Sequence, residues 1–280
     1  MRATFLCGLI GAGIQLSRSP ALHEREADEQ GLRYIYKLID LDKLGVGVEA
    51  LPELLNGAKQ MGFAGLNITY PCKQAIIPLL DELSEDARAL NAVNTVVIRD
   101  GRMTGHNTDW SGFAEGFRRG LPDAKRDRVV LLGAGGAGAA VAHAALTLGV
   151  RELTIVDLDA SRSAELAAKL GARARAGTNL AAAMAMAKAD GLIHCTPTGM
   201  AKMPGLPLDP GLLQARHWVA EIVYFPLETE LLRVARAKGC RTLDGSGMAV
   251  YQAVGAFRLF TGIEPDAERM MRIFKSIGSE

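Results

Sequence analysis

Short apolar runs and amphipathic stretches alternate along most of the chain. In the second half, the predicted strands and helices follow one another at 129–132, 136–149, 153–156, 161–170, 178–188, 191–195, 218–223 and 227–238. Strands that are apolar throughout and alternate with helices are typical of a parallel sheet covered on both faces. This half therefore predicts a doubly wound α/β domain.

The first half carries the same alternation with more polar interruptions. Strands are predicted at 4–10, 34–39, from 65 to a proline turn at 71, and at 91–98 with a short return at 103–104. Helices are predicted at 20–30, 48–60, 73–83 and 110–119, and two more, one to about 261 and one at 265–277, end the chain. The order of elements predicts a second α/β layer before the doubly wound one.

An apolar run that ends in glycine is the most informative stretch. Gly133, Gly135 and Gly138 follow the strand at 129–132 and have the spacing of a dinucleotide-binding turn. The first glycine allows the turn, the second lets backbone amides approach a pyrophosphate, and the third lets helix and strand pack closely. Asp157 ends the next strand, about twenty residues on, where a carboxylate meets the adenosine ribose. A nucleotide site is therefore expected here.

Composition narrows the range of partners. The 280 residues are 49% hydrophobic and carry a net charge of +1, so there is no electrostatic case for binding nucleic acid or a membrane surface. The four cysteines, Cys7, Cys72, Cys195 and Cys240, are scattered without a CxxC pair, so neither a metal site nor a disulfide framework is indicated. We expect a cytoplasmic protein that binds small molecules.

Several polar residues stand where loops meet helices, and each has a structural and a functional interpretation. Ser19, with Ser17 before it, either caps the next helix or faces a ligand. Lys73 stands in the first turn of the helix predicted at 73–83, where the helix dipole disfavours a cation, which indicates another role. Asp109 either caps the helix that follows or takes part in chemistry. The residues alone leave these alternatives open.

Taken in order, the motifs of the chain resemble those of the shikimate/quinate dehydrogenase family over nearly its whole length. On the substrate side the resemblance rests on Ser17-Arg18-Ser19-Pro20, Asn67-Ile68-Thr69-Tyr70-Pro71-Cys72-Lys73, Asn91-Ala92-Val93-Asn94-Thr95 and Asn107-Thr108-Asp109. On the cofactor side it rests on the glycine turn, Tyr224-Phe225-Pro226, Asp244-Gly245-Ser246-Gly247-Met248 and Gln252. The resemblance implies a substrate-binding domain at 1–110, a dinucleotide-binding domain at 111–245, and C-terminal helices at 246–280 that pack on the first domain.

The resemblance also implies roles for single residues. Lys73 and Asp109 become the catalytic pair, with Lys73 as general base and Asp109 orienting it. The implied substrate-binding residues are Ser17 and Ser19 for a carboxylate, and Asn67, Thr69, Asn94, Tyr224 and Gln252 around a polyhydroxy ring. The implied cofactor-binding residues are Gly133, Gly135, Gly136, Ala137, Gly138, Asp157, Leu158, Arg162, Thr196 and Gly247.

The cofactor is expected to be NAD rather than NADP. Members of the family that use NADP typically carry Asn-Arg-Thr after the second strand of the nucleotide domain, whereas this chain has Asp157-Leu158-Asp159. Two carboxylates would repel a 2′-phosphate. Arg162 either reaches a phosphate or pairs with Asp159, which leaves some NADP use open.

The expected reaction is reversible oxidation of shikimate to 3-dehydroshikimate, with quinate as a second substrate. Ser19 is the residue typical of shikimate users, while the motifs at 105–109 and 257–262 resemble the branch that accepts quinate. A short-chain dehydrogenase is disfavoured, because no tyrosine has a lysine four residues on. A paralogue acting on a modified, for example amino, shikimate and a non-catalytic ligand sensor are the remaining alternatives. The protein is expected to be a monomer or a homodimer.

Overall fold

The chain folds into two units, each built around one sheet, in the computed structural model, which describes residues 2–177 and 188–277. One unit combines Met1–Thr108 with Val250–Glu280, and the other is the continuous stretch Asp109–Ala249. The limits predicted for the functional domains, after residues 110 and 245, stay a prediction.

The first unit holds a mixed sheet with strand order β2-β1-β3-β5-β6-β4 among the described residues. Its strands are β1 (Thr4–Gly11), β2 (Arg33–Asp40), β3 (Gly65–Ile68), β4 (Glu82–Leu83), β5 (Thr95–Arg99) and β6 (Arg102–His106). Strand β1 runs parallel to β2 and β3, whereas β5 pairs antiparallel with both β3 and β6. The hairpin β5–β6 turns at Asp100 and Gly101, which both have positive φ.

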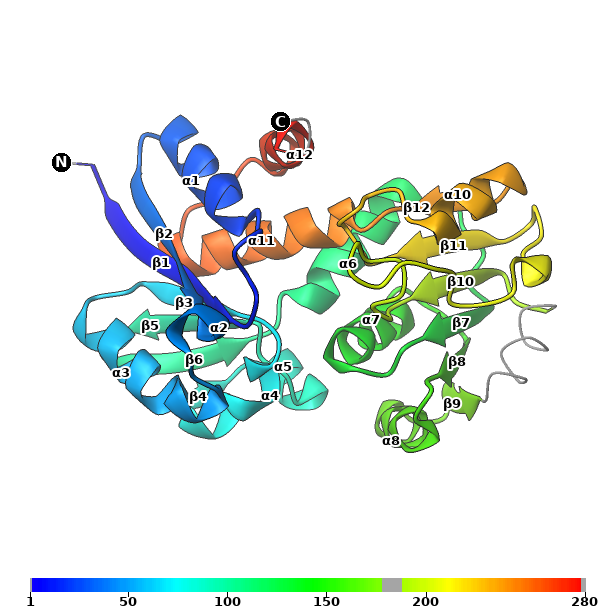
Figure 1. Cartoon of the computed structure of the whole chain (residues 1–280), viewed down its shortest axis with the longest axis horizontal. Coiled ribbons are helices and arrows are strands. Elements are labelled where there is room, and N and C mark those ends of the chain that lie inside the picture. Colours follow the sequence, from blue (N-terminus) through cyan, green and yellow to red (C-terminus); the bar gives the residue numbers. More distant parts are fainter. Residues whose placement is uncertain (1, 178–187, 278–280) are drawn as a thin grey trace. The chain divides into compact units, whose positions relative to one another are not determined.

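Helices cover both faces of this sheet (Figure 1). They are α1 (Ser19–Glu29), α2 (Leu41–Leu44), α3 (Leu51–Gln60), α4 (Cys72–Ala75), α5 (Glu85–Leu90), α11 (Ser246–Thr261) and α12 (Ala267–Ser276). Buried side chains of α2 to α5 pack on one face with Ile10, Leu66 and Val96. On the other face, Phe257 and Phe260 of α11 pack with Tyr34 and Tyr36 of β2. The C-terminal helices thus return to the N-terminal sheet.

The second unit holds a parallel sheet with strand order β12-β11-β10-β7-β8-β9 within the described residues. Its strands are β7 (Arg128–Leu132), β8 (Glu152–Val156), β9 (Ala174–Gly177), β10 (Gly191–His194), β11 (Trp218–Glu221) and β12 (Arg241–Leu243). From β7 the order runs outward in both directions, so the sheet is doubly wound. The carboxyl ends of β7 and β10 meet beside this change of direction, which is where open α/β sheets bind ligands.

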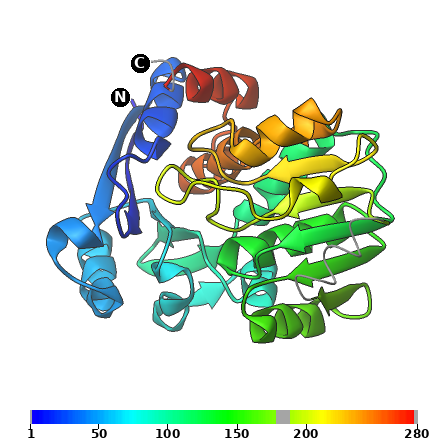
Figure 2. The same cartoon turned by 45° about the vertical axis from the view of Figure 1, so that its right-hand side comes forward.

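Alternate residues of the strands in this sheet supply the two faces of the core. Val129 and Leu131 of β7 pack with residues of α6 (Asp109–Gly120), α7 (Gly136–Thr147) and α8 (Ala160–Leu170). Val130 and Leu132 face the opposite side, where they pack with α10 (Glu230–Ala237). Figure 2 shows this unit with its sheet between helices. The predicted fold class is confirmed.

Most elements lie where the apolar pattern predicts them, and one predicted helix is wrong. The stretch 73–83 forms a single helical turn, α4, then a 3₁₀ turn at Ile77–Leu79 and the short strand β4. Pro78 stands inside the predicted helix and has no N–H to donate, which breaks the helical ladder. The helix predicted at 178–188 falls almost entirely outside the described residues.

Within residues 2–177 and 188–277, no helix combines the length and the apolarity that crossing a membrane requires.

Candidate active site

The glycine turn after β7 has the sterics of a phosphate-binding turn. Gly133 has φ +101°, and a Cβ there would lie 2.7 Å from the carbonyl oxygen of Cys195. A Cβ on Gly138 would overlap the carbonyl oxygen of Gly133, so both positions require glycine. By contrast, a Cβ on Gly135 or Gly136 would meet nothing within 4 Å. The turn is therefore closely packed on the inside and open on the outside.

The open side of the turn is also the amino end of a helix. Helix α7 begins at Gly136, its N-cap is Gly135, and no side chain caps it. The first amides of a helix have no partner within the helix and lie at the positive end of its dipole. An uncapped helix start behind an open glycine pair fits the pyrophosphate of a dinucleotide. Ala137 follows Gly136 in the first turn of this helix.

Asp157 follows β8, and its carboxylate is hydrogen-bonded to the backbone of the glycine turn. Its Oδ2 accepts the N–H of Ala134 at 2.7 Å, and its Oδ1 accepts the N–H of Asp159 at 2.9 Å. Two ionised oxygens offer about four acceptor positions, so capacity remains for ribose hydroxyls. Leu158 is 94% exposed. The carboxylate is fixed by the backbone at the place where a dinucleotide-binding fold puts the ribose.

Arg162 is paired within its own helix. Its Nε lies 3.5 Å from Oδ2 of Asp159, and Asp159 caps α8 by accepting the N–H of Ser161 at 3.0 Å. Hydrogen bonds from the Ser161 hydroxyl and amide hold the pKa of Asp159 below its usual range, which stabilises its negative charge. Of the two interpretations of Arg162, the ion pair with Asp159 is the one present.

The first unit contains a buried network of neutral donors and acceptors. Tyr36 donates its hydroxyl to Oδ1 of Asn67 at 2.7 Å, and Asn67 donates to the hydroxyl of Thr95 at 3.1 Å. The Asn94 amide contacts Thr95 and Thr108, with Oδ1 accepting the N–H of Thr108 at 2.7 Å. All but Tyr36 stand at the carboxyl end of β3, at the amino end of β5 or after β6. The register across the sheet therefore brings Asn67 and Asn94 together.

The loop before α1 is arranged differently from a capping loop. The N-cap of α1 is Arg18 and no side chain caps the helix, so the interpretation of Ser19 as its cap is wrong. Burial raises the pKa of Tyr36, and the nearby Ser19 side chain opposes this shift, while the hydroxyl of Ser17 accepts the N–H of Ser19 at 3.3 Å. Through Tyr36, this loop is connected to Asn67. The two serines thus belong to the same polar network as the asparagines.

Lys73 lies on the one-turn helix α4, directly after the carboxyl end of β3. Its carbonyl accepts the N–H of Val93 at 2.9 Å, which ties α4 to the segment that leads into β5. Because α4 has only four residues, its dipole is small and Lys73 also belongs to its last turn. The argument that Lys73 is misplaced in a helix dipole is therefore wrong, and its catalytic role stays a prediction.

Asp109 is the first residue of α6 rather than the cap before it. The side chain is buried, and a carboxylate in the first turn is favoured by the helix dipole. Lys73 belongs to the first unit and Asp109 opens the second. His106, the last residue of β6, has its pKa lowered by burial, which favours a neutral ring.

The remaining predicted residues lie on different parts of the two units. Thr69 follows β3 and donates its N–H to the carbonyl of Ile10 at 2.9 Å. Gln252 lies on α11, three residues before Gly255, where a Cβ would lie 3.1 Å from Cγ2 of Thr108. Tyr224 lies in the loop after β11 and is 42% exposed. Gly247, at the start of α11, faces Gly116 of α6, so that two backbones meet closely.

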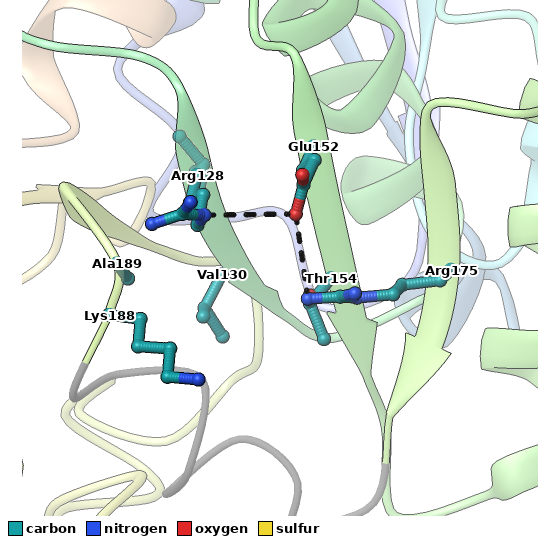
Figure 3. Close-up of a pocket in the computed structure, with 8 residues that line it drawn as sticks. Arg128, Val130, Glu152, Thr154, Arg175, Lys188 and Ala189 are labelled. Atoms are coloured by element: carbon teal, nitrogen blue, oxygen red, sulfur yellow. Dashed lines mark hydrogen bonds and ion pairs between the residues drawn. The ribbon is translucent and has the colours of Figure 1, made fainter.

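A cavity of about 250 Å³ lies at the opposite end of the second sheet from the glycine turn. Figure 3 shows its charged rim, where Glu152 lies 3.9 Å from Arg128 and 3.7 Å from Arg175. These residues belong to the amino ends of β7 and β8 and to β9. Open α/β sheets bind their ligands at the carboxyl ends of the strands, so this cavity is not the candidate active site.

Sequence reasoning missed several members of the site. Tyr36 and Thr95 join the network of the first unit, and His194 and Glu221 form a buried pair at the carboxyl ends of β10 and β11. The pair of His194 and Glu221 could have been suspected from the sequence, because an ionisable residue stands at the end of each of two apolar strands. Tyr36 gave no such signal, since it fits the apolar alternation of β2.

Comparison with known proteins places these features in a family. Residues 9–96 match the shikimate dehydrogenase substrate binding domain, and residues 245–273 match the shikimate 5′-dehydrogenase C-terminal domain. The chain is 60% identical over 276 residues to a shikimate dehydrogenase (NADP(+)) of Arthrobacter sp. FB24, covering 97% of this chain and 94% of that protein. It is 51% identical over 280 residues to a quinate/shikimate dehydrogenase (NAD(+)) of Corynebacterium efficiens, covering 98% and 99%.

A solved structure agrees over the same length. Quinate dehydrogenase from Corynebacterium glutamicum in complex with NAD matches with a TM-score of 0.93 and 50% identity, covering 98% of this chain and all of that one. Together with the glycine turn and the substrate-side motifs, these full-length similarities show that the chain belongs to the shikimate/quinate dehydrogenase family.

Proposed function

We propose that the protein catalyses the reversible, NAD-dependent oxidation of shikimate to 3-dehydroshikimate, and that it also oxidises quinate to 3-dehydroquinate. The observation that carries the proposal is the buried network of Tyr36, Asn67, Asn94, Thr95 and Thr108 beside Lys73. Recognition of a polyol requires many neutral donors and acceptors, because a polar group left without a partner in a buried site costs about 1–3 kcal/mol. The network supplies them on a rigid sheet.

The choice of NAD rests on residues of this chain, since its relatives bear both cofactor names. Asp157 and Asp159 put two carboxylates at the ribose end of the nucleotide site, and Arg162 is engaged by Asp159. The exposed Leu158 adds no positive charge. A 2′-phosphate would therefore meet negative charge without a matching cation, whereas ribose hydroxyls would meet acceptors.

The reaction requires that a secondary hydroxyl lose its proton while a hydride leaves the same carbon. When bound, NAD supplies the hydride acceptor. Lys73 Nζ, in its neutral form, takes the proton of the hydroxyl as general base, and the Asp109 carboxylate orients the Lys73 amine. The proton that Lys73 takes up then passes to solvent, which completes the proton balance of the oxidation.

The remaining substrate residues select the shape of the acid. Ser17 and Ser19 donate hydroxyl hydrogen bonds to the carboxylate, while Asn67, Thr69, Asn94 and Gln252 hold the ring hydroxyls. Tyr224 is a further proposed substrate-binding residue. Quinate carries one more hydroxyl beside its carboxylate, so the loop with Ser19 decides between the two acids by roughly 1–3 kcal/mol.

The proposal is tested by initial rates of nicotinamide reduction with shikimate and with quinate, each paired with NAD and with NADP. Turnover of either acid with a higher kcat/KM for NAD than for NADP supports it, and the ratio of the two acids assigns the preferred substrate. A lack of turnover in all four combinations would contradict it and favour a modified substrate or a ligand-sensing role.

Replacing the base gives the sharpest single test of the chemistry. Lys73→Ala is expected to lower kcat by roughly 10²–10⁴-fold, the usual contribution of a positioned general base, with a much smaller change in KM for shikimate. Lys59→Ala removes an exposed lysine of α3 and serves as the matched control. Turnover of Lys73→Ala close to that of the control would refute the assignment.

The protein is proposed to act in the reducing cytoplasm as a monomer or a homodimer. All four cysteines are free, buried thiols in the structure, which suits a compartment where disulfides do not form. Analytical ultracentrifugation of the purified protein distinguishes the two oligomeric states.

A further inference from the structure

A buried pair of ionisable side chains links two neighbouring strands of the nucleotide unit. His194 ends β10 and Glu221 ends β11, and the two residues are partners in the parallel register. Both are buried, and Nδ1 of His194 lies 2.9 Å from each carboxylate oxygen of Glu221. A pair of this kind is costly to bury unless further hydrogen bonds satisfy both members, so its other contacts matter.

In its other hydrogen bonds within the described part of the chain, the carboxylate of Glu221 accepts from backbone and hydroxyl donors. Its Oε1 accepts the N–H groups of Ile222 at 2.9 Å and Val223 at 3.0 Å, and its Oε2 accepts the hydroxyl of Thr229 at 3.1 Å. A carboxylate surrounded in this way acts as an acceptor toward His194 as well. The ring nitrogen Nδ1 therefore carries a proton and donates it to Glu221.

The far side of the imidazole meets the hydroxyl of Thr196. Nε2 of His194 lies 2.5 Å from Oγ1 of Thr196, and this oxygen also accepts the N–H of Thr198 at 3.3 Å. A neutral ring with its proton on Nδ1 accepts at Nε2, and the hydroxyl of Thr196 is then the donor to it. One lone pair of the Thr196 oxygen then remains for a ligand.

Thr196 adjoins the glycine turn. The turn that begins at Thr196 follows the carboxyl end of β10, next to β7, and a Cβ on Gly133 would lie 3.0 Å from Cγ2 of Thr196. The chain of contacts from Thr229 through Glu221 and His194 thus ends beside the open glycine turn. All of its members lie within the nucleotide unit.

We propose that Glu221 and His194 are positioning residues that orient the Thr196 hydroxyl, so that its oxygen accepts a hydrogen bond from a donor group of the bound dinucleotide. Glu221 fixes which ring nitrogen carries the proton, the ring fixes the direction of the Thr196 proton, and the remaining lone pair of the Thr196 oxygen selects a donor. The inference rests on the proposed function, since it assumes that a dinucleotide occupies the glycine turn.

Glu221→Gln tests the proposal with little change in volume. The amide oxygen keeps the position of Oε1, which accepts the two backbone N–H groups, and the amide NH₂ takes the position of Oε2, 2.9 Å from Nδ1, where its N–H opposes the ring proton. The ring proton then moves to Nε2, and the Thr196 proton turns toward the ligand, where it opposes a donor. We expect the Kd for NAD, measured by fluorescence titration without substrate, to rise by about tenfold, which is about 1.4 kcal/mol. In turnover, KM for NAD should rise while kcat changes much less.

The double-mutant cycle with Thr196→Val separates positioning from general stability. In the Thr196→Val background, Glu221→Gln is expected to leave the Kd for NAD unchanged, because the hydroxyl through which it acts is gone. ¹⁵N NMR of the histidine rings should show Nδ1 protonated in the wild type and Nε2 protonated in Glu221→Gln. An unchanged Kd in Glu221→Gln, or an equal loss in both backgrounds, would overturn the proposal.

The nature of the donor is resolved with a cofactor analogue. 3-Acetylpyridine adenine dinucleotide lacks the amide N–H groups of NAD, so an effect of Glu221→Gln that disappears with it assigns the donor to the carboxamide, and one that persists assigns it to a ribose hydroxyl. Because these titrations need no substrate, a protein that binds NAD through this contact but oxidises neither acid would refute the proposed function and leave this inference standing.

Discussion

At the scale of single residues, the proposed choice of NAD depends on the side chains that follow β8. Asp157 is held by the N–H groups of Ala134 and Asp159, so its carboxylate cannot turn away from the ribose position without breaking both bonds. The neighbouring Leu158 is almost fully exposed and has no role in the core. Leu158 can therefore be exchanged without disturbing the sheet, whereas Asp157→Asn keeps only one of the two acceptor oxygens.

Exchange of this pair should shift the preference toward NADP. In Asp157→Asn with Leu158→Arg, the repulsion of a 2′-phosphate is lost and a cation is gained, so the ratio of kcat/KM for NADP to that for NAD should rise at least about tenfold, or 1.4 kcal/mol. Glu165→Arg, on the exposed side of α8, changes the net charge by the same amount and is the control. An unaltered ratio would contradict the argument from charge.

A buried histidine of the first unit makes stability sensitive to acid. His23 is fully buried between Tyr34, Tyr36 and Phe257, and its Nε2 has no hydrogen-bond partner among the described residues. Burial lowers the pKa of His23 to about 3. Since the unfolded chain binds this proton near pH 6.5 and the folded chain does not, His23 destabilises the fold as the pH falls below 6.5.

The size of this effect follows from the same pKa difference. Between pH 7 and pH 5, His23 should remove about 2 kcal/mol from the free energy of unfolding, or 1.36 kcal/mol for each pH unit below 6.5. His23→Leu does not titrate, so urea denaturation should show a pH dependence smaller by about this amount. Equal losses in the two proteins would mean that His23 takes up no proton on unfolding.

Among the elements, those whose formation depends on local sequence were predictable. The strand, glycine turn and helix from Arg128 to Thr147 follow from apolar runs and glycine spacing that act over neighbouring residues. The helix predicted at 73–83 was wrong because the amphipathic pattern continues through Pro78, where the backbone cannot continue a helix. The two-residue strand β4 exists because β6 lies beside it, and no local signal marks such a pairing.

The same distinction holds for the candidate site. Gly133, Gly138 and Asp157 could be found from the sequence, because the nucleotide site is built within one βαβ unit. The contact of Asn67 with Thr95 depends on the register between β3 and β5, and the contact of His194 with Glu221 depends on β10 and β11 being neighbours. A single sequence carries no pairing information of this kind, so the network and the buried pair needed the fold.

At the scale of the whole molecule, the two ends of the chain close the first unit. Helix α12 lies beside α1, and Figures 1 and 2 both show this pair. Arg269 bonds both oxygens of the buried Glu26, at 2.7 and 2.8 Å, and Glu26 also accepts the N–H of Asp266. The carboxylate of Glu26 is thus neutralised by a residue 243 positions away.

Removing Arg269 should lower the free energy of unfolding. Arg269→Met leaves the buried Glu26 carboxylate without its cation, and the loss of one partner of a buried pair costs about 3 kcal/mol or more of unfolding free energy. Arg272→Met, on an exposed position of α12, should change the urea midpoint far less. Similar midpoints for the two variants would mean that Glu26 is satisfied by its other donors.

The interrupted first unit has a consequence for synthesis on the ribosome. The nucleotide unit is a continuous stretch, Asp109–Ala249, whereas the first unit lacks Phe257 and Phe260 of its core until residues that follow the nucleotide unit have been translated. Folding units generally form as they emerge, the N-terminal one first. Here the order is reversed: the second unit is complete while the N-terminal sheet still has one uncovered face, which is the interval in which the nascent chain is most exposed to aggregation.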